Sequence, residues 1–478
     1  MQDPVVFNQN QQIMTIVTLY FTFDKDFNKQ QPSWDVILQE LLERFSPPSI
    51  STDVKSHSKT SSSTDRKNSK PSCSSDSSSP AGLDLLSMEQ WESFEEKYRS
   101  MDNDSKWKLG DVFVEDIIYE YAKGLKYEHA AHSFILNLAD KRWQKVFTQA
   151  QLREIENKSF VPLPTLPQEL TDFFNKFKNV NNLDDAWKIA DESRFDPVRE
   201  FDADCAKRTV LNVIAGYRWD TINRIGRNGK ERDVMRLWRA IDDSFDDLKA
   251  DVFRSDQLSS SSSSRHNEER NAIDGSIKQK VLGAKPDLII SKNMIEFAAA
   301  EQGYSDEAGC GVKELSERYL KLPKNLKDML LKIGCHLDND RKSIRAVRTV
   351  GFSHTHLRMT GLIMDAPCGY VCRVRELKEI TIPCEFERFA KTYIRFLKHV
   401  FILKYVVKNT MDIVKNGPPS TVEEEDDEEE DTEMFESIVD KHKDTLIIPS
   451  CLNRIGDRSK KILKKRKIDE IIENNATL

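Results

Sequence analysis

Two carboxylates stand at the ends of two short apolar runs in the segment GAKPDLIISKNMIEFAAAEQG, residues 283–303. Asp287 opens the run DLII, and Glu301 closes the run IEFAAAE fourteen positions later. If the runs are neighbouring strands joined by a turn at SKN, both acids lie at the same end of a hairpin. Like charges at one sheet edge repel each other unless a cation lies between them, and carboxylate oxygens suit Mg²⁺. The spacing therefore predicts a magnesium site.

Helical and extended patterns alternate around this hairpin. Residues 231–253 carry apolar side chains at intervals of three and four, which predicts an amphipathic helix before it. A helical stretch from 312 to 333 that is broken at Pro323, a meander of strands, and a helix from 386 to about 414 follow. This order of elements predicts an α/β fold in which helices flank a mixed sheet.

The order of Pro286 and Asp287, followed by Glu301 at the end of the next strand, resembles the PD-(D/E)XK phosphodiesterase superfamily. That superfamily has the core of restriction endonucleases, and the resemblance covers roughly residues 228–415. It implies a restriction-endonuclease-like sheet and metal-dependent hydrolysis of a phosphodiester, with DNA as the substrate. Because an acid on the preceding helix often joins the site in that family, the resemblance also implies a role for Glu231.

The chain departs from the family pattern at one position. The pattern has a lysine two residues after the second acid, where this chain has Gly303. Lysine orients or activates the attacking water, which glycine cannot do. Lys313, in GCGVKELSERY, is the first candidate to replace it, and Lys292, in the hairpin turn, is the second. Without either lysine, the core would bind its substrate but not cleave it.

The resemblance assigns a role to each candidate residue. Asp287 and Glu301 would hold Mg²⁺, with a backbone carbonyl near Gln302 as a further ligand. The metal would polarise the phosphate and lower the pKa of bound water, while Lys313 would stabilise the developing charge. Glu231 would hold a water or a second metal.

A second hypothesis needs no catalysis. Pro-Asp is a common entry to a buried strand and Glu-Gln-Gly a common exit, so the same sheet could be the scaffold of a binding or regulatory protein. His354 and His356, in SHTH, share one strand face as a metal pair would, but no third ligand follows nearby. A polar strand face is the simpler interpretation of this pair.

Composition divides the chain into five regions. In the helical region, capping boxes at Ser87 and Thr148 and a pattern over residues 131–147 predict helices. The regions are a small N-terminal segment (1–46), a disordered Ser/Lys-rich linker (47–82), a helical region (83–195), the α/β core with a disordered serine-rich insert at 256–272 (196–415), and a largely disordered tail (416–478).

The overall composition is that of a soluble protein without membrane spans. Of its 478 residues 38% are hydrophobic and 32% charged, and no apolar run is long enough to cross a bilayer. The net charge of −7 reflects the acidic run at 423–431, through which protein partners could bind. The cluster RSKKILKKRK, at 458–467, is typical of a nuclear import signal, a nucleic-acid patch or a solvated helix face. With no secretory signal, the expected compartment is the nucleus, or otherwise the cytoplasm.

Overall fold

A computed structural model of the chain describes six stretches of the sequence. The segments expected at 1–46 and 47–82, the acidic run at 423–431 and the basic cluster at 458–467 lie outside them. What is described belongs to one compact unit, Gly82–Leu478. The described stretches are residues 85–228, 231–254, 257–268, 280–303, 312–417 and 444–453.

Helices and strands alternate along these stretches. The helices are α3 (Met88–Arg99), α4 (Val114–Lys123), α5 (Gln149–Asn157), α6 (Gln168–Lys176), α7 (Leu183–Glu192), α8 (Phe201–Arg218), α9 (Thr221–Asn228), α10 (Glu231–Asp243), α11 (Ser260–His266), α12 (Val312–Ser316), α13 (Leu322–His336), α14 (Arg341–Ala346) and α15 (Phe389–Asn416). The strands are β1 (Lys108–Leu109), β2 (Val112–Phe113), β3 (Ile135–Asn137), β4 (Asp251–Arg254), β5 (Leu288–Lys292), β6 (Ile295–Gly303), β7 (Thr349–Thr355), β8 (Arg358–Cys368), β9 (Val371–Glu376) and β10 (Ile380–Thr381).

One mixed sheet of eight strands organises the described residues, which confirms the expected α/β fold with flanking helices. Its order is β3-β9-β8-β7-β6-β5-β4, with β10 paired to β8. The pairs β6–β7 and β3–β9 are parallel and the others antiparallel. Because β3 comes from the region expected to be helical, that region and the core share a sheet.

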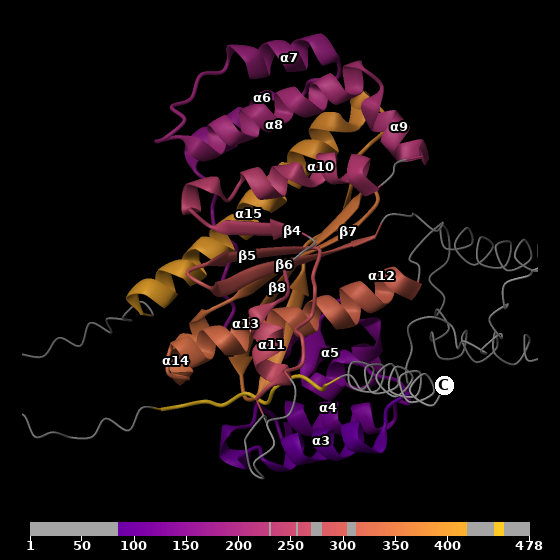
Figure 1. Cartoon of the computed structure of the whole chain (residues 1–478), viewed down its shortest axis with the longest axis vertical. Coiled ribbons are helices and arrows are strands. Elements are labelled where there is room, and N and C mark those ends of the chain that lie inside the picture. Colours follow the sequence, from indigo (N-terminus) through magenta and orange to yellow (C-terminus); the bar gives the residue numbers. More distant parts are fainter. Residues whose placement is uncertain are drawn as a thin grey trace, which may run out of the picture. The chain divides into compact units, whose positions relative to one another are not determined.

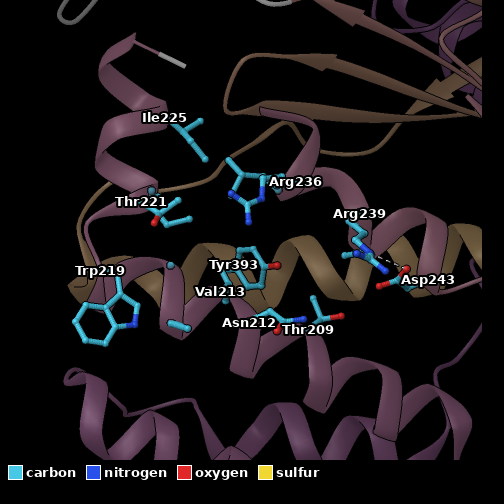
Figure 2. A pocket seen from close by; sticks show the side chains of 15 residues that line it. Thr209, Asn212, Val213, Trp219, Thr221, Ile225, Arg236, Arg239, Asp243 and Tyr393 are labelled. Carbon is cyan, nitrogen blue, oxygen red and sulfur yellow. Dashed lines mark hydrogen bonds and ion pairs between the residues drawn. The ribbon is translucent and has the colours of Figure 1, made fainter. Parts of the chain in front are cut away.

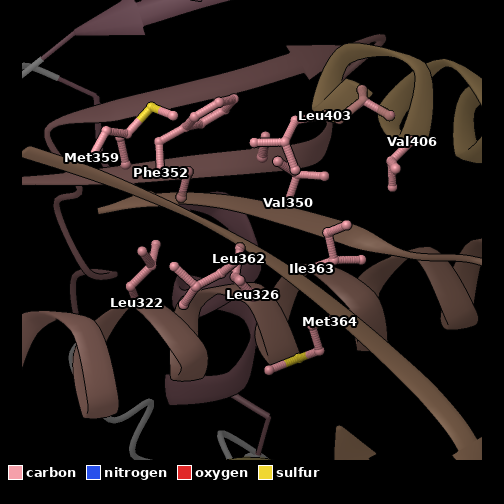
Figure 3. Close-up of a cluster of buried hydrophobic side chains, with 14 of the residues drawn as sticks. Leu322, Leu326, Val350, Phe352, Met359, Leu362, Ile363, Met364, Leu403 and Val406 are labelled. Atoms are coloured by element: carbon pink, nitrogen blue, oxygen red, sulfur yellow. The ribbon is translucent and has the colours of Figure 1, made fainter. Parts of the chain in front are cut away.

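Helices cover both faces of the sheet (Figure 1). Helix α13 packs against β6 and β7 on one face, and α15 packs against the same strands on the other. Figure 3 shows the apolar side chains between these layers, with Leu326 of α13 and Leu403 of α15 on opposite sides. Two glycines allow this close approach: a Cβ at Gly351 would lie 3.0 Å from Leu326, and one at Gly361 would lie 2.7 Å from Leu403.

The capping boxes confirm two predicted helix starts, and one predicted helix is wrong. Ser87 and Thr148 each accept a hydrogen bond from the amide three residues later, at the start of α3 and of α5. The pattern over 131–147 does not form one helix. Phe134 adopts a left-handed conformation with φ 47°, and the buried strand β3 follows and pairs with β9.

The helix expected over residues 231–253 ends sooner than its apolar pattern suggests. Helix α10 ends at Asp243, and β4 then pairs with β5. Arg254 of β4 donates hydrogen bonds of 2.6 Å to both carboxylate oxygens of Asp242. This ion pair connects β4 to the end of α10. The pairing of β4 with β5 therefore outweighs the local helical pattern of residues 244–253.

The serine-rich insert, expected to be disordered over 256–272, contains the helix α11. The N-terminus of α11 contacts the buried carboxylate of Glu296. This carboxylate accepts hydrogen bonds from the Ser259 hydroxyl at 2.8 Å and from the Ser260 amide at 2.6 Å. At the other end, Arg265 forms a buried ion pair of 2.8 Å with Asp328 of α13. Both partners are distant in sequence, so composition alone does not reveal this helix.

A short piece of the tail also packs on the core, although the tail is expected to be largely disordered. The side chains of Leu446, Ile448, Cys451 and Leu452 are buried. The Lys324 ammonium on α13 donates a 2.6 Å hydrogen bond to the Leu452 carbonyl. Among the described residues, no helix is long and apolar enough to cross a membrane.

Candidate functional site

The two acids lie at the open end of the β5–β6 hairpin. The turn consists of Asn293 and Met294, which both have positive φ angles of 52° and 65°, as a tight two-residue turn requires. The expected turn at SKN is therefore displaced, because its first two residues belong to β5. The amide of Asp287 donates a 3.0 Å hydrogen bond to the Ala300 carbonyl, so Asp287 and Glu301 share one end of the hairpin, as expected.

Asp287 is held against the end of β6 by the backbone. Its Oδ2 accepts a 2.6 Å hydrogen bond from the amide of Gln302. Gln302, expected to contribute a backbone carbonyl to a metal, thus contacts the candidate site through its N–H. The Gln302 side chain is 2% exposed, and its Nε2 has no hydrogen-bond partner among the described residues.

Glu301 is a buried carboxyl group with little compensation. It is 8% exposed, and within the described residues its hydrogen bond comes from the Asn325 amide at 3.4 Å. Burial, the charge of Asp287 and that of Glu317 raise the pKa of Glu301 to about 8, against the opposing effect of Lys321 and Lys313. Near neutral pH this carboxyl group is therefore mostly protonated, and a cation beside it would favour its ionised form.

Helix α12 and the π-helical turn that follows it bring a third acid and two lysines to this region. The turn, Glu317–Lys321, lies between α12 and α13. Pro323 has no N–H for the carbonyl of Tyr319, and a widened turn at this place avoids the break that the sequence suggests. The buried carboxylate of Glu317 lies 3.3 Å from the Lys321 ammonium and 3.7 Å from that of Lys313.

The two lysines differ in their influence on the acids. Lys313, the expected site lysine, has a side chain that is 64% exposed. Lys321 is less exposed, at 37%, and it lowers the pKa of Glu301 more than Lys313 does. Sequence reasoning missed Lys321 and Glu317, although Lys313, Glu317 and Lys321 recur at intervals of four and so share one helix face.

The second lysine candidate is in the wrong place. Lys292 pairs with Ile295 at the turn of the hairpin, which is the end opposite Asp287 and Glu301. Its ammonium donates a 2.7 Å hydrogen bond to the Leu248 carbonyl. Lys292 therefore ties the turn to the segment before β4 and does not serve the acids.

Gly303, at the position of the family lysine, ends β6. A Cβ at this position would lie 3.4 Å from the Thr355 side chain, which is an ordinary van der Waals contact. The backbone carbonyl of Gly303 accepts a 3.0 Å hydrogen bond from the amide of His356. A larger side chain at residue 303 therefore meets no close obstacle at its first atom.

The described contacts of the two histidines lie in the core and not at the acids of the hairpin. Glu231 begins α10, but its side chain lies outside the described residues. His354 is buried and stacks on Trp238 with 4.7 Å between ring centroids, and burial lowers its pKa to about 3. His356 approaches the Ile225 carbonyl at 3.0 Å. The expected polar strand face is thus partly an aromatic layer of the core.

The donor atoms at the hairpin end fit a hard divalent cation. Their oxygens are carboxylates, the ligands that Mg²⁺ prefers, and the pKa of Glu301 is raised by its burial and by the charge of Asp287. Among the described residues, however, no three His, Cys, Asp or Glu side chains converge as a metal-binding group. Residues 304–311, which include Asp306 and Glu307 and follow Gly303 directly, lie outside the described stretches.

No family model, curated protein or solved structure matches this chain. Any function assigned to the chain therefore has to be argued from the residues of the site. It combines Asp287, held by a backbone amide, with Glu301, which is buried and has a raised pKa. The π turn adds the buried Glu317 and Lys321, and the preceding helix α12 adds Lys313.

Proposed function

We propose that the chain is a metal-dependent phosphodiesterase of the PD-(D/E)XK type that acts on DNA. The observation that supports this function best is the buried carboxyl group of Glu301 beside Asp287, with its pKa raised to about 8. Such a pair favours the binding of a divalent cation. The order α10, β4, α11, β5, β6, α12, α13, α14 and β7 contains the helix before the hairpin, the helix after it and a returning strand, the elements on which the resemblance rests.

Each residue has a defined task in this proposal. Asp287 and Glu301 would hold the cation, and Glu301 would release its proton as the cation binds. A bound Mg²⁺ would polarise the phosphate ester and lower the pKa of a bound water. Lys321 and Lys313 would stabilise negative charge on the phosphate, because both already act on Glu301 electrostatically.

Gly303 favours a second candidate function, that of a non-catalytic nucleic-acid-binding or protein-binding regulator on the same scaffold. No lysine stands at this position, and the nearby ammonium groups of Lys313 and Lys321 both contact Glu317. In this alternative the acids and lysines bind a ligand but do not activate water. Protein partners would bind the acidic run at 423–431.

The basic cluster at 458–467 supports the nucleus as the compartment of the chain under both candidate functions. Ten residues of this segment include seven lysines and arginines, a density typical of import signals. Fusion of residues 458–467 to a fluorescent protein tests the proposal, since the fusion should accumulate in nuclei. Equal distribution between nucleus and cytoplasm would contradict it.

Cleavage of DNA by the purified full chain separates the two functions. We expect Mg²⁺-dependent cleavage of single- or double-stranded DNA that a chelator abolishes. Asp287→Asn and Glu301→Gln should each lower the rate at least about a hundredfold, as loss of an essential charged group does. Asp251→Asn, at an exposed acid of β4, is the matched control and should keep the rate. Cleavage that survives the double change at 287 and 301 rules out the proposed site.

The variant Gly303→Lys tests the alternative. It restores the family lysine at a position where the first side-chain atom makes only ordinary contact with Thr355. If the natural chain binds DNA without cleaving it, a gain of metal-dependent cleavage in Gly303→Lys shows that the missing lysine alone blocks catalysis. No gain in a folded variant that still binds Mg²⁺ favours the regulator.

A further inference from the structure

A cavity of about 400 Å³ is lined by residues of α8, α9, α10 and α15 and of the turn between α8 and α9, and neither Asp287 nor Glu301 is among them. Its volume is in the range of small-molecule binding sites, about 300–1,000 Å³. Figure 2 shows the side chains that surround it. The lining residues are Thr209, Asn212, Val213, Ala215, Gly216, Trp219, Thr221, Ile222, Ile225, Arg236, Leu237, Arg239, Ala240, Asp243 and Tyr393.

The walls of this cavity are aliphatic and its floor carries a hydroxyl group. Ile225 of α9 lies on one side and Val213 of α8 on the other, and both are buried (Figure 2). Tyr393 of α15, which is 2% exposed, lies between them, and its hydroxyl has no hydrogen bond to the described residues. Burial raises the pKa of Tyr393, so the hydroxyl stays protonated and can donate to a ligand. A cavity with aliphatic side chains on two sides and a buried hydroxyl suits a ligand with an apolar face and polar edges.

One cation is directed into the cavity. The guanidinium of Arg236, an exposed residue of α10, points toward Tyr393 (Figure 2), and it forms no ion pair with the described residues. Arg239, in contrast, lies 3.3 Å from Asp243 and is neutralised there. An arginine without a carboxylate partner beside such a cavity favours an anionic ligand, since guanidinium binds phosphate and carboxylate in a fixed fork geometry.

The mouth of the cavity carries an exposed indole. Trp219, at the end of α8, is 71% exposed, although tryptophan is seldom left in water. Exposed aromatic rings beside basic groups are the usual platforms on which nucleobases stack. Thr209 and Asn212, one helical turn apart on α8, offer a hydroxyl and an amide for the polar edge of a base.

We propose that this cavity binds a nucleotide unit. The base lies between the aliphatic walls, with Trp219 at the edge of the cavity, and the phosphate binds the Arg236 guanidinium. The ligand is either a free 5′-mononucleotide or one unstacked nucleotide of a single strand, which share this chemistry. The site uses none of the acids at the hairpin end, so it does not depend on the proposed phosphodiesterase function.

Calorimetric titration of the full chain tests the proposal. The chain carries Glu301→Gln and the buffer contains a chelator, so that the proposed metal site cannot contribute. We expect adenosine 5′-monophosphate to bind saturably at one site, with adenosine and inorganic phosphate at least about tenfold weaker, because each lacks one half of the ligand. Arg236→Ala should weaken binding about tenfold or more, as loss of a charged hydrogen bond does. Tyr393→Phe and Trp219→Ala should weaken it by smaller factors.

The matched control is Arg208→Ala, which removes an exposed arginine of α8 that lies outside the cavity and pairs with Asp204 at 2.9 Å. It should leave the affinity unchanged. A single-stranded oligodeoxyadenylate that binds more tightly than the monophosphate, and is displaced by it, identifies the strand as the source. Binding of the monophosphate alone identifies the free nucleotide. Equal affinity for adenosine, equal effects of Arg236→Ala and Arg208→Ala, or no saturable binding of either probe would overturn the proposal.

Discussion

Strand β6 contains two buried glutamates with opposite surroundings. Glu296, 5% exposed, accepts hydrogen bonds from the Ser259 hydroxyl and from two amides at the start of α11. Glu301, 8% exposed, accepts one long hydrogen bond, from the Asn325 amide, among the described residues. It also lies near the charge of Asp287. A buried carboxylate that is fully hydrogen-bonded stabilises the fold, whereas one that lacks donors is costly without a ligand. The difference marks the first as structural and the second as a candidate binding group.

The largest expected effect is on the structural glutamate. Glu296→Ala removes the acceptor of three hydrogen bonds and leaves buried donors without a partner, which should lower the free energy of unfolding by about 3 kcal/mol. Urea unfolding measures this loss, and proteolysis within residues 257–268 should accelerate. The control Glu95→Ala, at an exposed glutamate paired with Arg99, should change stability by less than about 0.5 kcal/mol. A loss at Glu296 as small as the control's would contradict the assigned role.

The candidate binding glutamate should respond in the opposite direction. Its pKa is about 8 in the folded chain and about 4.5 without the fold, so the folded state binds more protons between these values. Stability therefore falls as the pH rises from about 5 to 8, by up to about 1.4 kcal/mol per pH unit. In metal-free buffer, Glu301→Gln removes this slope, so its stability relative to the natural chain should rise by about 2 kcal/mol between pH 5 and about pH 6.5. Thermal unfolding at both pH values measures it, and an equal difference at the two would contradict the account.

A smaller effect separates the two lysines. Lys321→Met and Lys313→Met should both raise the pKa of Glu301, because both ammonium groups favour its ionised form. The rise should be larger for Lys321, at roughly half a pH unit, and smaller for Lys313, which is mostly exposed. Carboxyl NMR titration of Glu301 measures both changes. A larger rise for Lys313→Met would reverse the assignment of the main cation.

Local patterns predicted the elements that position the site. The alternation of apolar runs around Asp287 and Glu301 identified the hairpin, because strand pairing there follows from neighbouring residues. The long apolar stripe after residue 386 likewise predicted α15. The two acids at one end of the hairpin followed from its tight turn, even though that turn lies at Asn293 and Met294 and not at SKN.

Partners distant in sequence account for what the patterns missed. A serine-rich segment has no apolar stripe, and α11 forms because Glu296 and Asp328 bind its ends. Lys321 and Glu317 join the site through a π turn that depends on Pro323, which sequence reasoning took as a break. Lys292 lies at the turn of the hairpin, as expected, and that end is opposite the acids, so it cannot take the role of the family lysine.

Calorimetric titration of Mg²⁺ into the full chain at pH 7, in buffers of different ionisation enthalpy, tests the central claim most directly. Glu301, protonated in the free chain, should release close to one proton for each ion bound, and this release should disappear at pH 9. The variant Glu301→Gln should lose both the binding and the proton release. Saturable binding that is unchanged in Glu301→Gln, or no binding in the natural chain, would contradict a cation site at the end of β6.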